Sequence, residues 1–543
     1  MEFNLADLFE NAADAFGDRD YLVADGVTRT YAEMEARANR LAHHLAAQGI
    51  GPGDHVGIYA YNSAEWVETL WAVFKLRAVW ININYRYVED ELAYLFANAD
   101  LKALVFAREF APRLRNVIDN LPLLQHSIVV EDGSDGDLAG LDAVAFEDAM
   151  AAGSPARDFG PRSPDDHYIL YTGGTTGMPK GVVWRHEDVF MALGGGIDPY
   201  TSERVSGPEE MVAKGHAAGG QLTFFPIAPL MHGATQWGVM GQSFTGNKVV
   251  LMAKFDPAEV WRTIAAESVN LMMITGDAMG RPLIEELEAH PEDFDPSSLF
   301  AVTSSAAIFS SSVKDKFFEF LPDLVITDAI GSSESGNNGM AVITKGNTKM
   351  AGGPTVSVIK GAFVLDDELR PVEPGCGVMG KVARSGNIPV GYYNDPVKTA
   401  ETFVYGPDGT RYAMPGDFAY LEADGTITLL GRGSVSINSG GEKIFPEEVE
   451  GAVKSHPDVF DAVVVGVADE RWGQRVAAVI QVREGASADL AAIQEHCRTK
   501  IAGYKVPRQL NVVTTMQRSP SGKADYRWAL SVADGEVAST ELT

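Results

Sequence analysis

The sequence contains little cysteine, few basic residues and no long apolar run. Cys376 and Cys497 are the only cysteines among 543 residues, which excludes a disulfide framework and a cysteine-based zinc site. Lysine and arginine number 44 against 74 acidic residues. The resulting formal net charge of -30 argues against general binding to nucleic acid or to an anionic membrane surface, though not against a small anionic ligand. No stretch approaches the roughly 18 apolar residues of a spanning helix, so we expect no integral membrane segment.

The first residues, Met1 to Asp7, also lack the basic and then apolar pattern of a signal peptide, so a cytoplasmic protein is expected. Hydrophobic residues make up 45% and charged residues 22% of the chain, which is typical of a folded protein rather than a disordered one. A chain of this length can form more than one domain and bury a sizeable core. The sequence leaves the oligomeric state open, and a homodimer is compatible with it.

Helical and strand patterns alternate along the first hundred residues. Thr30 and Glu33 have the spacing of a capping box, which predicts that a helix begins after Thr30. Apolar strand patterns at 55–61, 79–83 and 103–106 are separated by stretches with apolar residues three or four positions apart. Strands that alternate with helices of this length indicate a mostly parallel, doubly wound sheet.

Later stretches differ in residue composition and in the spacing of turns. Residues 131–166 are rich in Gly, Ala, Asp and Pro and are expected to cross the surface, and the polar residues 201–221 are expected to form a long loop, either a lid or loosely ordered. Short strands separated by turns at 353–430 predict a β-rich sub-domain. The expected fold class is α/β, with a large N-terminal domain of doubly wound sheets and a β-rich sub-domain over residues 1–432. A small α+β C-terminal domain is expected over residues 433–543.

The stretch from Tyr171 to Gly181 is a candidate phosphate-binding loop. It holds four glycines, three threonines and Lys180 within eleven residues. Glycine lets the backbone approach a ligand closely, and threonine hydroxyls, backbone N–H groups and a lysine suit phosphate oxygens. The spacing is not that of a Walker A loop, and the stretch is expected to join two strands rather than a strand and a helix. Taken alone, a glycine-rich surface turn remains the alternative.

Four further stretches combine turn residues with charged side chains. They are 328–336 with Glu334 in a glycine turn after an apolar strand at 324–326, 416–432 with Asp417 and Arg432, 439–443 with Gly440 and Gly441, and 518–524 with Lys523. Ligands of open α/β sheets bind beyond the carboxyl ends of the strands, which suits the first of these. Each is weak evidence alone, because Asp-Gly turns and exposed charges are common on surfaces.

In this order and spacing, the five stretches resemble the acyl-activating, adenylate-forming superfamily of acyl-CoA synthetases, luciferases and peptide-synthetase adenylation domains. The resemblance covers the chain from about Leu8 to Lys523. It implies that the small C-terminal domain is mobile. It also implies an ATP-dependent acid–CoA ligase that uses ATP, Mg²⁺ and CoA. A carboxylate and ATP would give an acyl-adenylate and pyrophosphate, and CoA would then take the acyl group and release AMP. Joining a carboxylate to a negative phosphate needs charge neutralisation and alignment more than a general base.

The resemblance also implies roles for single residues. Phosphate contacts would come from Thr172, Gly173, Gly174, Thr175, Thr176, Gly177 and Lys180. Adenine contacts would come from Ser305, Ala306, Ala307, Ile330, Gly331, Ser332 and Ser333, and ribose contacts from Asp417 and Arg432. Glu334, together with Thr172, would hold Mg²⁺ through hard oxygen ligands. Lys523 would bridge the carboxylate and the α-phosphate. Gly440, Gly441 and His232 would line the CoA tunnel, with a core histidine as the alternative for His232.

Three positions depart from the pattern of the superfamily. Gly173 stands where a serine is usual, which removes one hydroxyl from the phosphate loop. Ile330 stands where a tyrosine is common, so adenine would lose an aromatic wall. Ser434 replaces the usual Asp or Lys of the hinge, which puts the hinge assignment in doubt. None of the three removes a residue that the chemistry requires.

The positions that line the acyl pocket in this superfamily are apolar here and include four methionines. They are Ala234, Trp237, Met240, Met272, Met273, Gly276, Ala278 and Met279. With no Arg or Lys among them to pair with a second carboxylate, a bulky hydrophobic monocarboxylic acid is expected. Methionine adapts to irregular space, so several of these residues could instead fill the core. The chain further resembles bacterial ligases for steroid side-chain acids. A medium- or long-chain fatty acyl-CoA synthetase is the alternative for the substrate. An enzyme that delivers its acyl group to a carrier protein and a non-catalytic nucleotide sensor are alternatives for the function.

Overall fold

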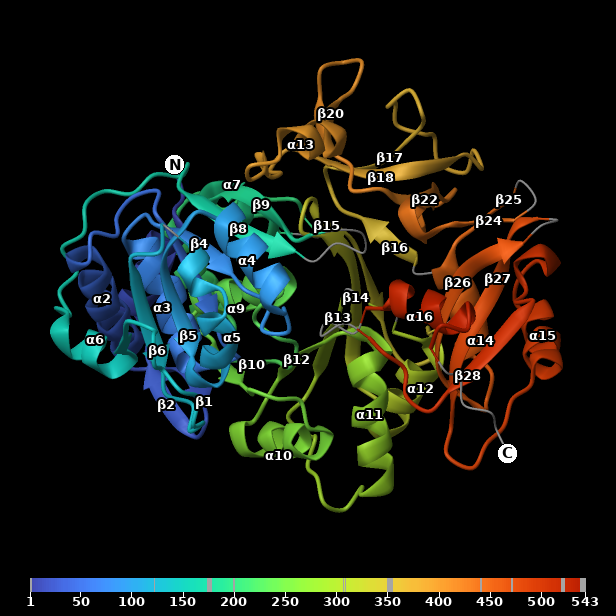
Figure 1. Cartoon of the computed structure of the whole chain (residues 1–543), viewed down its shortest axis with the longest axis horizontal. Helices are drawn as coiled ribbons and strands as arrows, with labels where there is room; N and C mark the ends of the chain where they lie inside the picture. The colour runs from blue at the N-terminus through green and yellow to red at the C-terminus, as the bar shows by residue number, and fades with distance from the viewer. Residues whose placement is uncertain are drawn as a thin grey trace.

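Three β-sheets organise the chain in the computed structural model (Figure 1). The described residues are 2–121, 123–172, 178–198, 201–305, 307, 309–348, 355–439, 442–469, 472–518 and 523–537, with only the backbone at 120, 432, 434, 442 and 443. In Figure 1 the second sheet and its helices lie at the left, and the third sheet, in orange and red, lies at the right. The large sheet connects the two.

The large sheet changes from parallel to antiparallel pairing at its middle. In spatial order its strands are β2 (Val27–Thr30), β1 (Asp20–Ala24), β11 (Lys248–Leu251), β10 (Thr223–Pro226), β12 (Leu271–Ile274), β13 (Ala301–Ser304), β14 (Val325–Ser332), β15 (Gly336–Ile343), β16 (Thr355–Val358), β23 (Thr426–Arg432), β22 (Asp417–Leu421), β18 (Met379–Ser385), β21 (Arg411–Ala413) and β20 (Phe403–Tyr405), with β17 (Ala362–Leu365) beside β18. Pairing is parallel from β1 to β14 and antiparallel beyond β14. The antiparallel part is the β-rich sub-domain that the sequence predicted.

The second and third sheets are smaller. The second has the order β19 (Gly391–Tyr392), β9 (Lys180–Arg185), β8 (His167–Thr172), β4 (Val79–Asn82), β3 (His55–Tyr59), β5 (Leu101–Ala107), β6 (His126–Val130) and β7 (Ala143–Ala145). The third has the order β25 (Glu442–Ile444), β24 (Ile437–Ser439), β27 (Gly473–Val482) and β26 (Val459–Asp469), with β28 (Gln509–Val513) beside β27. Parallel strands dominate the second sheet, as expected for βαβ connections.

Helices cover the faces of all three sheets (Figure 1). They are α1 (Leu5–Phe16), α2 (Tyr31–Ala47), α3 (Ala64–Lys75), α4 (Glu89–Asn98), α5 (Ala111–Arg115), α6 (Phe146–Ala152), α7 (His186–Leu193), α8 (Pro208–Ala217), α9 (Gly233–Phe244), α10 (Pro257–Glu267), α11 (Gly276–Ala289), α12 (Ser311–Phe320), α13 (Pro396–Thr402), α14 (Pro446–Lys454), α15 (Leu490–Arg498) and α16 (Tyr526–Ala533), with 3-10 turns at Arg108–Phe110, Ile118–Asn120, Gly433–Val435 and Gly503–Lys505. Across the described part of the chain, no helix combines the length and apolar character needed to cross a membrane.

Local signals place several of these elements. The capping box before α2 is present, since the Thr30 hydroxyl accepts from the Glu33 N–H at 3.2 Å and the Glu33 carboxylate accepts from the Thr30 N–H at 2.8 Å. At α10, the Asp256 side chain accepts from the Glu259 N–H, and Pro257 occupies the first helical position. These signals act within a few residues, so the sequence alone predicts them.

Alternating side chains bury both faces of the parallel strands. Leu22 and Ala24 belong to the hydrophobic cluster that reaches the second sheet, whereas Val23 between them belongs to the cluster beneath α10, α11 and α12. Phe224 and Phe225 divide in the same way on β10. A strand covered on both faces reads as a continuous apolar run, which is the pattern seen in the sequence.

Two stretches expected to be irregular contain regular structure. The expected loop at 201–221 includes α8, which Pro208 opens at its first helical position and which buries Met211. A β-carbon at Gly215 of α8 would lie 2.1 Å from the carbonyl oxygen of Thr245, so this helix packs closely against the chain after α9. Residues 131–166 likewise include β7 and α6. Both helices are short, and tertiary packing rather than a long apolar stripe stabilises them.

The strand before Glu334 is also longer than expected. The apolar pattern predicted a strand at 324–326, but β14 runs from Val325 to Ser332 and pairs with β15 from Ile326 to Ser332. The tight turn therefore lies at 333–335. A β-carbon at Gly331 would lie 2.2 Å from the carbonyl oxygen of Gly336, so only glycine fits the end of this hairpin.

The chain leaves the large sheet at Arg432, the end of β23, and enters the third sheet at Ile437, the start of β24. From there to residue 537 it forms one unit, here called the C-terminal unit, in which α14 and α15 pack on one face of the third sheet and α16 on the other. The α/β class with a β-rich sub-domain and a small α+β unit at the C-terminus is therefore confirmed.

A buried group of charges joins α1, α2 and α3. The Lys75 side chain is 0% exposed, and its ammonium donates to Glu10 at 2.6 Å and to Glu35 at 2.8 Å. Arg162 and Arg157 donate to the same two carboxylates at 2.7 and 2.8 Å. Burial lowers the pKa of Lys75, and the two carboxylates act in the opposite direction. Removal of one member of such a buried network leaves uncompensated charge.

We expect Lys75→Met to lower the free energy of unfolding of the N-terminal part of the chain by about 3 kcal/mol, because Glu10 and Glu35 each lose a buried partner. Urea unfolding followed by tryptophan fluorescence measures the change. The matched control is Lys398→Met, since the Lys398–Glu401 pair is 40% and 59% exposed and should contribute at most about 1 kcal/mol. Equal effects of the two substitutions would contradict the importance of the buried group.

Candidate functional site

The candidate phosphate loop joins two neighbouring strands of the second sheet. Thr172 ends β8, Lys180 begins β9, and the two residues face each other in the antiparallel register. This confirms that the loop connects strand to strand. The residues between them that were assigned to phosphate, Gly173 to Gly177, lie outside the described residues. Both flanking residues thus lie at the carboxyl end of β8, which is where ligands bind in parallel sheets.

Tyr392 connects Lys180 with Glu334. The Tyr392 hydroxyl donates a hydrogen bond of 2.9 Å to Oε1 of Glu334, and the Lys180 ammonium lies 6.0 Å from the centre of the Tyr392 ring. Tyr392 lies on β19, which pairs with β9 at the edge of the second sheet. The sequence assigned roles to Lys180 and Glu334 but missed Tyr392, because one tyrosine after a glycine carries no chemical signal of its own.

A second bond fixes the turn that carries Glu334. The indole N–H of Trp184, a fully buried residue of β9, donates to the carbonyl oxygen of Ser333 at 3.0 Å. The Glu334 N–H in turn donates to the Ser332 hydroxyl at 3.2 Å. The β14–β15 turn of the large sheet is therefore held against β9 of the second sheet.

Asn82 links the phosphate loop to the segment before His232. Its carboxamide nitrogen donates to the carbonyl oxygens of Tyr171 and Met231 at 2.8 and 2.7 Å, and its oxygen accepts from the Tyr171 N–H at 2.7 Å. Asn82 is buried at the carboxyl end of β4. Sequence reasoning missed this residue too, although one polar residue at the end of an otherwise apolar strand was a visible signal.

His232 lies at the N-terminal end of α9. A β-carbon at Gly233 would lie 2.4 Å from Leu170 Cδ2, so the helix begins in close contact with β8. The His232 Nε2 atom is buried and has no hydrogen-bond partner among the described residues. Burial lowers the pKa of His232 to about 3, and the positive charges of Lys523 and Arg86 act in the same direction. The imidazole is therefore neutral near pH 7.

Lys523 is exposed, and its charge reaches His232 from the C-terminal unit. Two contacts seat that unit on α11. Arg483 forms an ion pair of 2.8 Å with Glu285, and the Arg281 guanidinium lies 5.7 Å from the centre of the Phe460 ring. The charge of Lys523 therefore acts on His232, although the two candidate site residues are far apart in the sequence. Gly440 and Gly441, assigned to the CoA tunnel, lie outside the described residues.

The candidate nucleoside residues lie along the large sheet. Asp417 faces Arg432 in the register of β22 and β23, although the Arg432 side chain is not described. Ser305 and Ala307 follow the end of β13, where the Ser304 hydroxyl accepts from the Gly276 N–H at 3.1 Å. Ala306 lies outside the described residues.

Ile330 is one of the residues assigned to adenine, and it is buried. Its side chain is 8% exposed and belongs to a hydrophobic cluster of the β-rich sub-domain. Gly331, the next residue along β14, is exposed. Of the residues assigned to adenine here, Gly331, Ser332 and Ser333 are therefore more accessible to a ligand than the Ile330 side chain.

The eight predicted acyl-pocket residues do not share one face of the large sheet. Trp237 and Met240 are buried in the cluster between the large and second sheets, and Ala234 and Met273 pack against it. Met272 and Met279 are buried in the cluster beneath α10 and α11, on the opposite face. Successive β12 residues point to opposite faces, so Met272 and Met273 could not line the same wall. Gly276, with φ of 51°, and the partly buried Ala278 lie at the start of α11.

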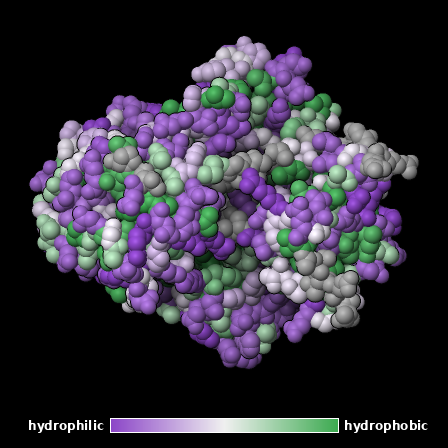
Figure 2. All heavy atoms as spheres, in the orientation of Figure 1, coloured by the Kyte–Doolittle hydropathy of each residue, from purple (hydrophilic) through white to green (hydrophobic). Residues whose placement is uncertain are grey.

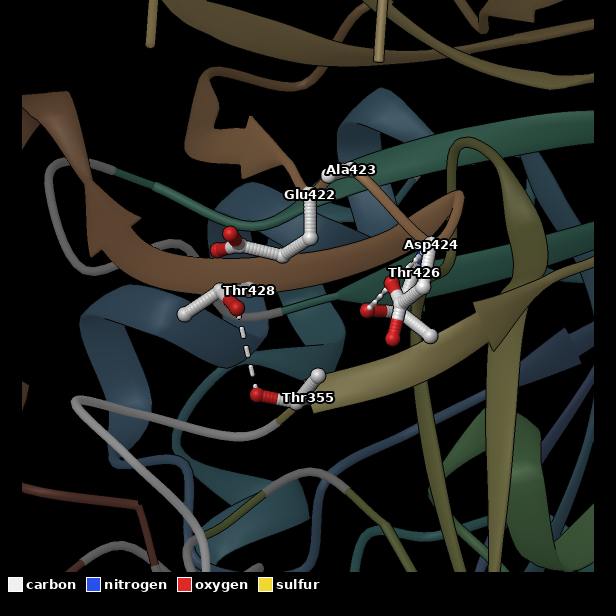
Figure 3. A pocket seen from close by; sticks show the side chains of 6 residues that line it. All are labelled: Thr355, Glu422, Ala423, Asp424, Thr426 and Thr428. Carbon is white, nitrogen blue, oxygen red and sulfur yellow. Dashed lines mark hydrogen bonds between the residues drawn. The ribbon is translucent and has the colours of Figure 1, made fainter. Parts of the chain in front are cut away.

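A hollow of about 430 Å³ lies apart from these residues (Figure 3). Glu422, Asp424, Thr426 and Thr428 of the β22–β23 hairpin line it with Thr355. The Asp424 carboxylate accepts from the Thr426 N–H and hydroxyl at 2.9 and 2.7 Å, which closes the hairpin turn. This is the end of the hairpin opposite the Asp417–Arg432 pair, and two carboxylates there do not suit a phosphate. Figure 2 shows a separate recess near the middle of the molecule, between the N-terminal half and the C-terminal unit.

The residues present fit a magnesium ion that arrives with a nucleotide. Mg²⁺ is commonly bound by one or two carboxylates together with substrate phosphates and water, rather than by a complete protein cage. Glu334 accepts one hydrogen bond at Oε1 and makes no ion pair with any described residue. No group of three His, Cys, Asp or Glu side chains able to hold a metal occurs among the described residues. Glu334 and Thr172 would therefore hold the ion only with the phosphates present.

Comparison with known proteins gives matches over nearly the whole chain. Residues 9–393 match the family model for AMP-binding enzymes, and residues 448–523 match that for the AMP-binding enzyme C-terminal domain. The chain is 53% identical to a 3-oxocholest-4-en-26-oate–CoA ligase of Rhodococcus rhodochrous over 97% of its own length and 96% of the relative. It is 52% identical to a medium/long-chain-fatty-acid–CoA/3-oxocholest-4-en-26-oate–CoA ligase of Mycolicibacterium smegmatis over 99% and 98%.

Among solved structures, the anthranilate CoA ligase AuaEII in complex with anthranoyl-AMP is similar with a TM-score of 0.83. The match covers 98% of each chain at 23% sequence identity, and it shows the fold alone.

The carboxamide of Asn82 should be essential to the site's geometry. We expect Asn82→Asp to lower the free energy of unfolding by about 2–4 kcal/mol, because two buried carbonyl oxygens lose their only donor from this side chain. Urea unfolding of variant and wild type measures the loss. Asn347→Asp, at an exposed turn, is the control and should change the value by less than about 0.5 kcal/mol. A loss of that small size for Asn82→Asp would refute the role of the bridge.

Proposed function

The chain belongs to the family of AMP-binding enzymes, and we propose that within this family it is an AMP-forming acid–CoA ligase. Carboxylate and ATP give an acyl-adenylate and pyrophosphate, and CoA then takes the acyl group and releases AMP. The observation that carries this proposal is the 53% identity, over 97% of the chain, to a relative named as a ligase of this kind. We take the two domains to be residues 1–432 and 433–543. We place the protein in the cytoplasm. A homodimer is an option that light scattering tests.

The nucleotide lies across the carboxyl ends of the parallel strands. The loop from Thr172 to Lys180 holds the β- and γ-phosphates, and Asp417 with Arg432 holds the ribose. Lys180 has no ion-pair partner among the described residues, which supports a role toward an anionic ligand. Mg²⁺ at Glu334 and Thr172 would neutralise phosphate charge.

Lys523 is the residue that joins the two reacting groups. A carboxylate and an α-phosphate are both negative, so their approach needs a cation positioned between them. The charge of Lys523 contributes to the lowered pKa of His232, and His232 follows Met231, which Asn82 ties to the phosphate loop. This influence supports the role of Lys523.

The second half-reaction needs a passage for CoA more than an acid–base pair. An acyl-adenylate is a reactive anhydride, and a thiol of ordinary pKa, about 8.5, supplies some thiolate at neutral pH. We assign Gly440, Gly441 and His232 to this passage. The lowered pKa of His232 supports this assignment, because a neutral imidazole adds no positive charge to that of Lys523. Rotation of residues 433–543 would exchange Lys523 for the glycine loop.

The proposed substrate is a bulky hydrophobic monocarboxylic acid, in the first place a steroid side-chain acid like 3-oxocholest-4-en-26-oate. The names of two relatives at 53% and 52% identity support this choice, and one of them also names medium- and long-chain fatty acids. Of the residues predicted to line the pocket, Ala234, Trp237 and Met273 lie on the α9 side and Met272 and Met279 on the other. We therefore propose that the acyl group follows the α9 side.

We expect Lys523→Ala to slow adenylate formation by roughly 100- to 1000-fold, since one preformed electrostatic contact with the transition state is lost. Thioester formation from supplied acyl-adenylate should stay within about 3-fold of wild type. Single-turnover assays of pyrophosphate release and of acyl-CoA formation separate the two steps. Lys500→Ala, an exposed lysine of the same unit, is the control and should leave both steps unchanged. Equal loss of both half-reactions would refute the assigned role.

Mass spectrometry of products tests the proposed function as a whole. With ATP, Mg²⁺, CoA and a panel of steroid, fatty and aryl acids, we expect AMP and the CoA thioester of the steroid acid, with fatty acyl-CoA as the second product. Fatty acyl-CoA alone would favour a general fatty acyl-CoA synthetase. AMP release that needs no CoA would favour transfer to a carrier protein, and ATP binding without pyrophosphate release would favour a sensor.

A further inference from the structure

Tyr392 is held rigidly at the edge of the second sheet. Its N–H donates to the Thr399 hydroxyl at 2.9 Å, and its ring meets that of Phe403 edge-on at 5.9 Å. A β-carbon at the preceding Gly391 would lie 2.6 Å from Thr399 Cγ2, so glycine is needed there for α13 to approach β19. Backbone pairing with Val182 of β9 completes the frame. The phenol is therefore presented by fixed backbone and packed neighbours.

The two groups that flank the Tyr392 ring have opposite charge. The hydroxyl donates to Oε1 of Glu334 at 2.9 Å, and the Lys180 ammonium lies 6.0 Å from the ring centre. Lys180 and Glu334 nevertheless form no ion pair with each other, nor with another described residue. A direct pair would neutralise both groups and leave neither for a ligand. With Tyr392 between them as a neutral partner of each, the carboxylate keeps its charge available to a cation and the lysine keeps its charge available to a phosphate.

We propose that Tyr392 is a positioning residue for the metal-binding carboxylate of Glu334, and this role rests on the function proposed above. The hydroxyl occupies one carboxylate oxygen of Glu334, which holds the carboxylate in place and leaves its other oxygen to bind a cation. Removal of a residue that hydrogen-bonds a metal ligand typically lowers metal affinity or activity by roughly 10- to 100-fold. Tyr392 touches neither the acid nor the reacting atoms in this proposal, so it acts through Glu334.

The sequence supplies a matched control in the next residue. The Tyr393 hydroxyl donates to Oδ2 of Asp100 at 2.9 Å, and its ring packs edge-on against His55 at 4.8 Å. Tyr392→Phe and Tyr393→Phe thus each remove one phenol-to-carboxylate hydrogen bond from adjacent positions and keep the ring. A general loss of packing would affect both variants, whereas a loss specific to metal positioning affects the first alone.

The test measures metal binding directly. Electron paramagnetic resonance follows the binding of Mn²⁺ to the enzyme in the presence of ATP, and the Mg²⁺ concentration that gives half-maximal pyrophosphate release is measured in parallel. For Tyr392→Phe we expect both midpoints to rise by roughly 10-fold or more, with the KM for the acid within about 2-fold of wild type. For Tyr393→Phe both midpoints should stay within about 2-fold. Melting curves establish that both variants are folded.

Two results would overturn the assignment. Tyr392→Phe with wild-type Mn²⁺ binding would show that the hydroxyl does not position Glu334, even if the rate had fallen. Equal rises in the two variants would show a structural effect. Both results leave the ligase function intact, since the wild-type enzyme would still release pyrophosphate in a metal-dependent way. A wild type that binds ATP but releases no pyrophosphate with any acid of the panel would overturn the ligase proposal and the assignment together.

Discussion

The carboxamide of Asn82 sets the spacing on which the site depends. Each of its two polar atoms is used, toward Tyr171 on one side and Met231 on the other, and all three bonds are buried. The residues that follow these partners are Thr172 and His232, so one side chain fixes the start of the phosphate loop relative to the start of α9. An amide suits this position because it both donates and accepts, and because buried carbonyl oxygens without a donor are costly.

Charge placement follows from that frame. The chain has a formal net charge of -30, and yet its candidate site gathers Lys180 from one strand end and Lys523 from the C-terminal unit. Lys180 serves an anionic ligand only if acidic neighbours do not neutralise it, and Tyr392 lies between Lys180 and Glu334. The charge of Lys523 helps to lower the pKa of the buried His232, which therefore adds no positive charge of its own. An acidic protein can therefore hold phosphate through local geometry while its overall field repels nucleic acid.

Local chemistry explains which elements the sequence could predict. The capping box at Thr30 and Glu33 and the strand-to-strand nature of the phosphate loop depend on a few neighbouring residues, and both were right. The loop expected at 201–221 was wrong in part, because α8 owes its stability to packing against α1 and the chain after α9. The strand expected at 324–326 was too short, since pairing with β15 extends β14 to Ser332 through polar residues that an apolar pattern does not include.

By itself the sequence determined the fold class and the order of the five motifs, because turn chemistry, capping and hydrophobic periodicity are properties of short segments. It also named Lys180, Glu334 and Lys523. Only the tertiary structure decided which residues hold them in place. The partners of Asn82 lie as many as 149 residues away, and Tyr392 lies 58 residues from Glu334. Such contacts depend on strand order and on how two sheets meet, and no spacing along the chain encodes either.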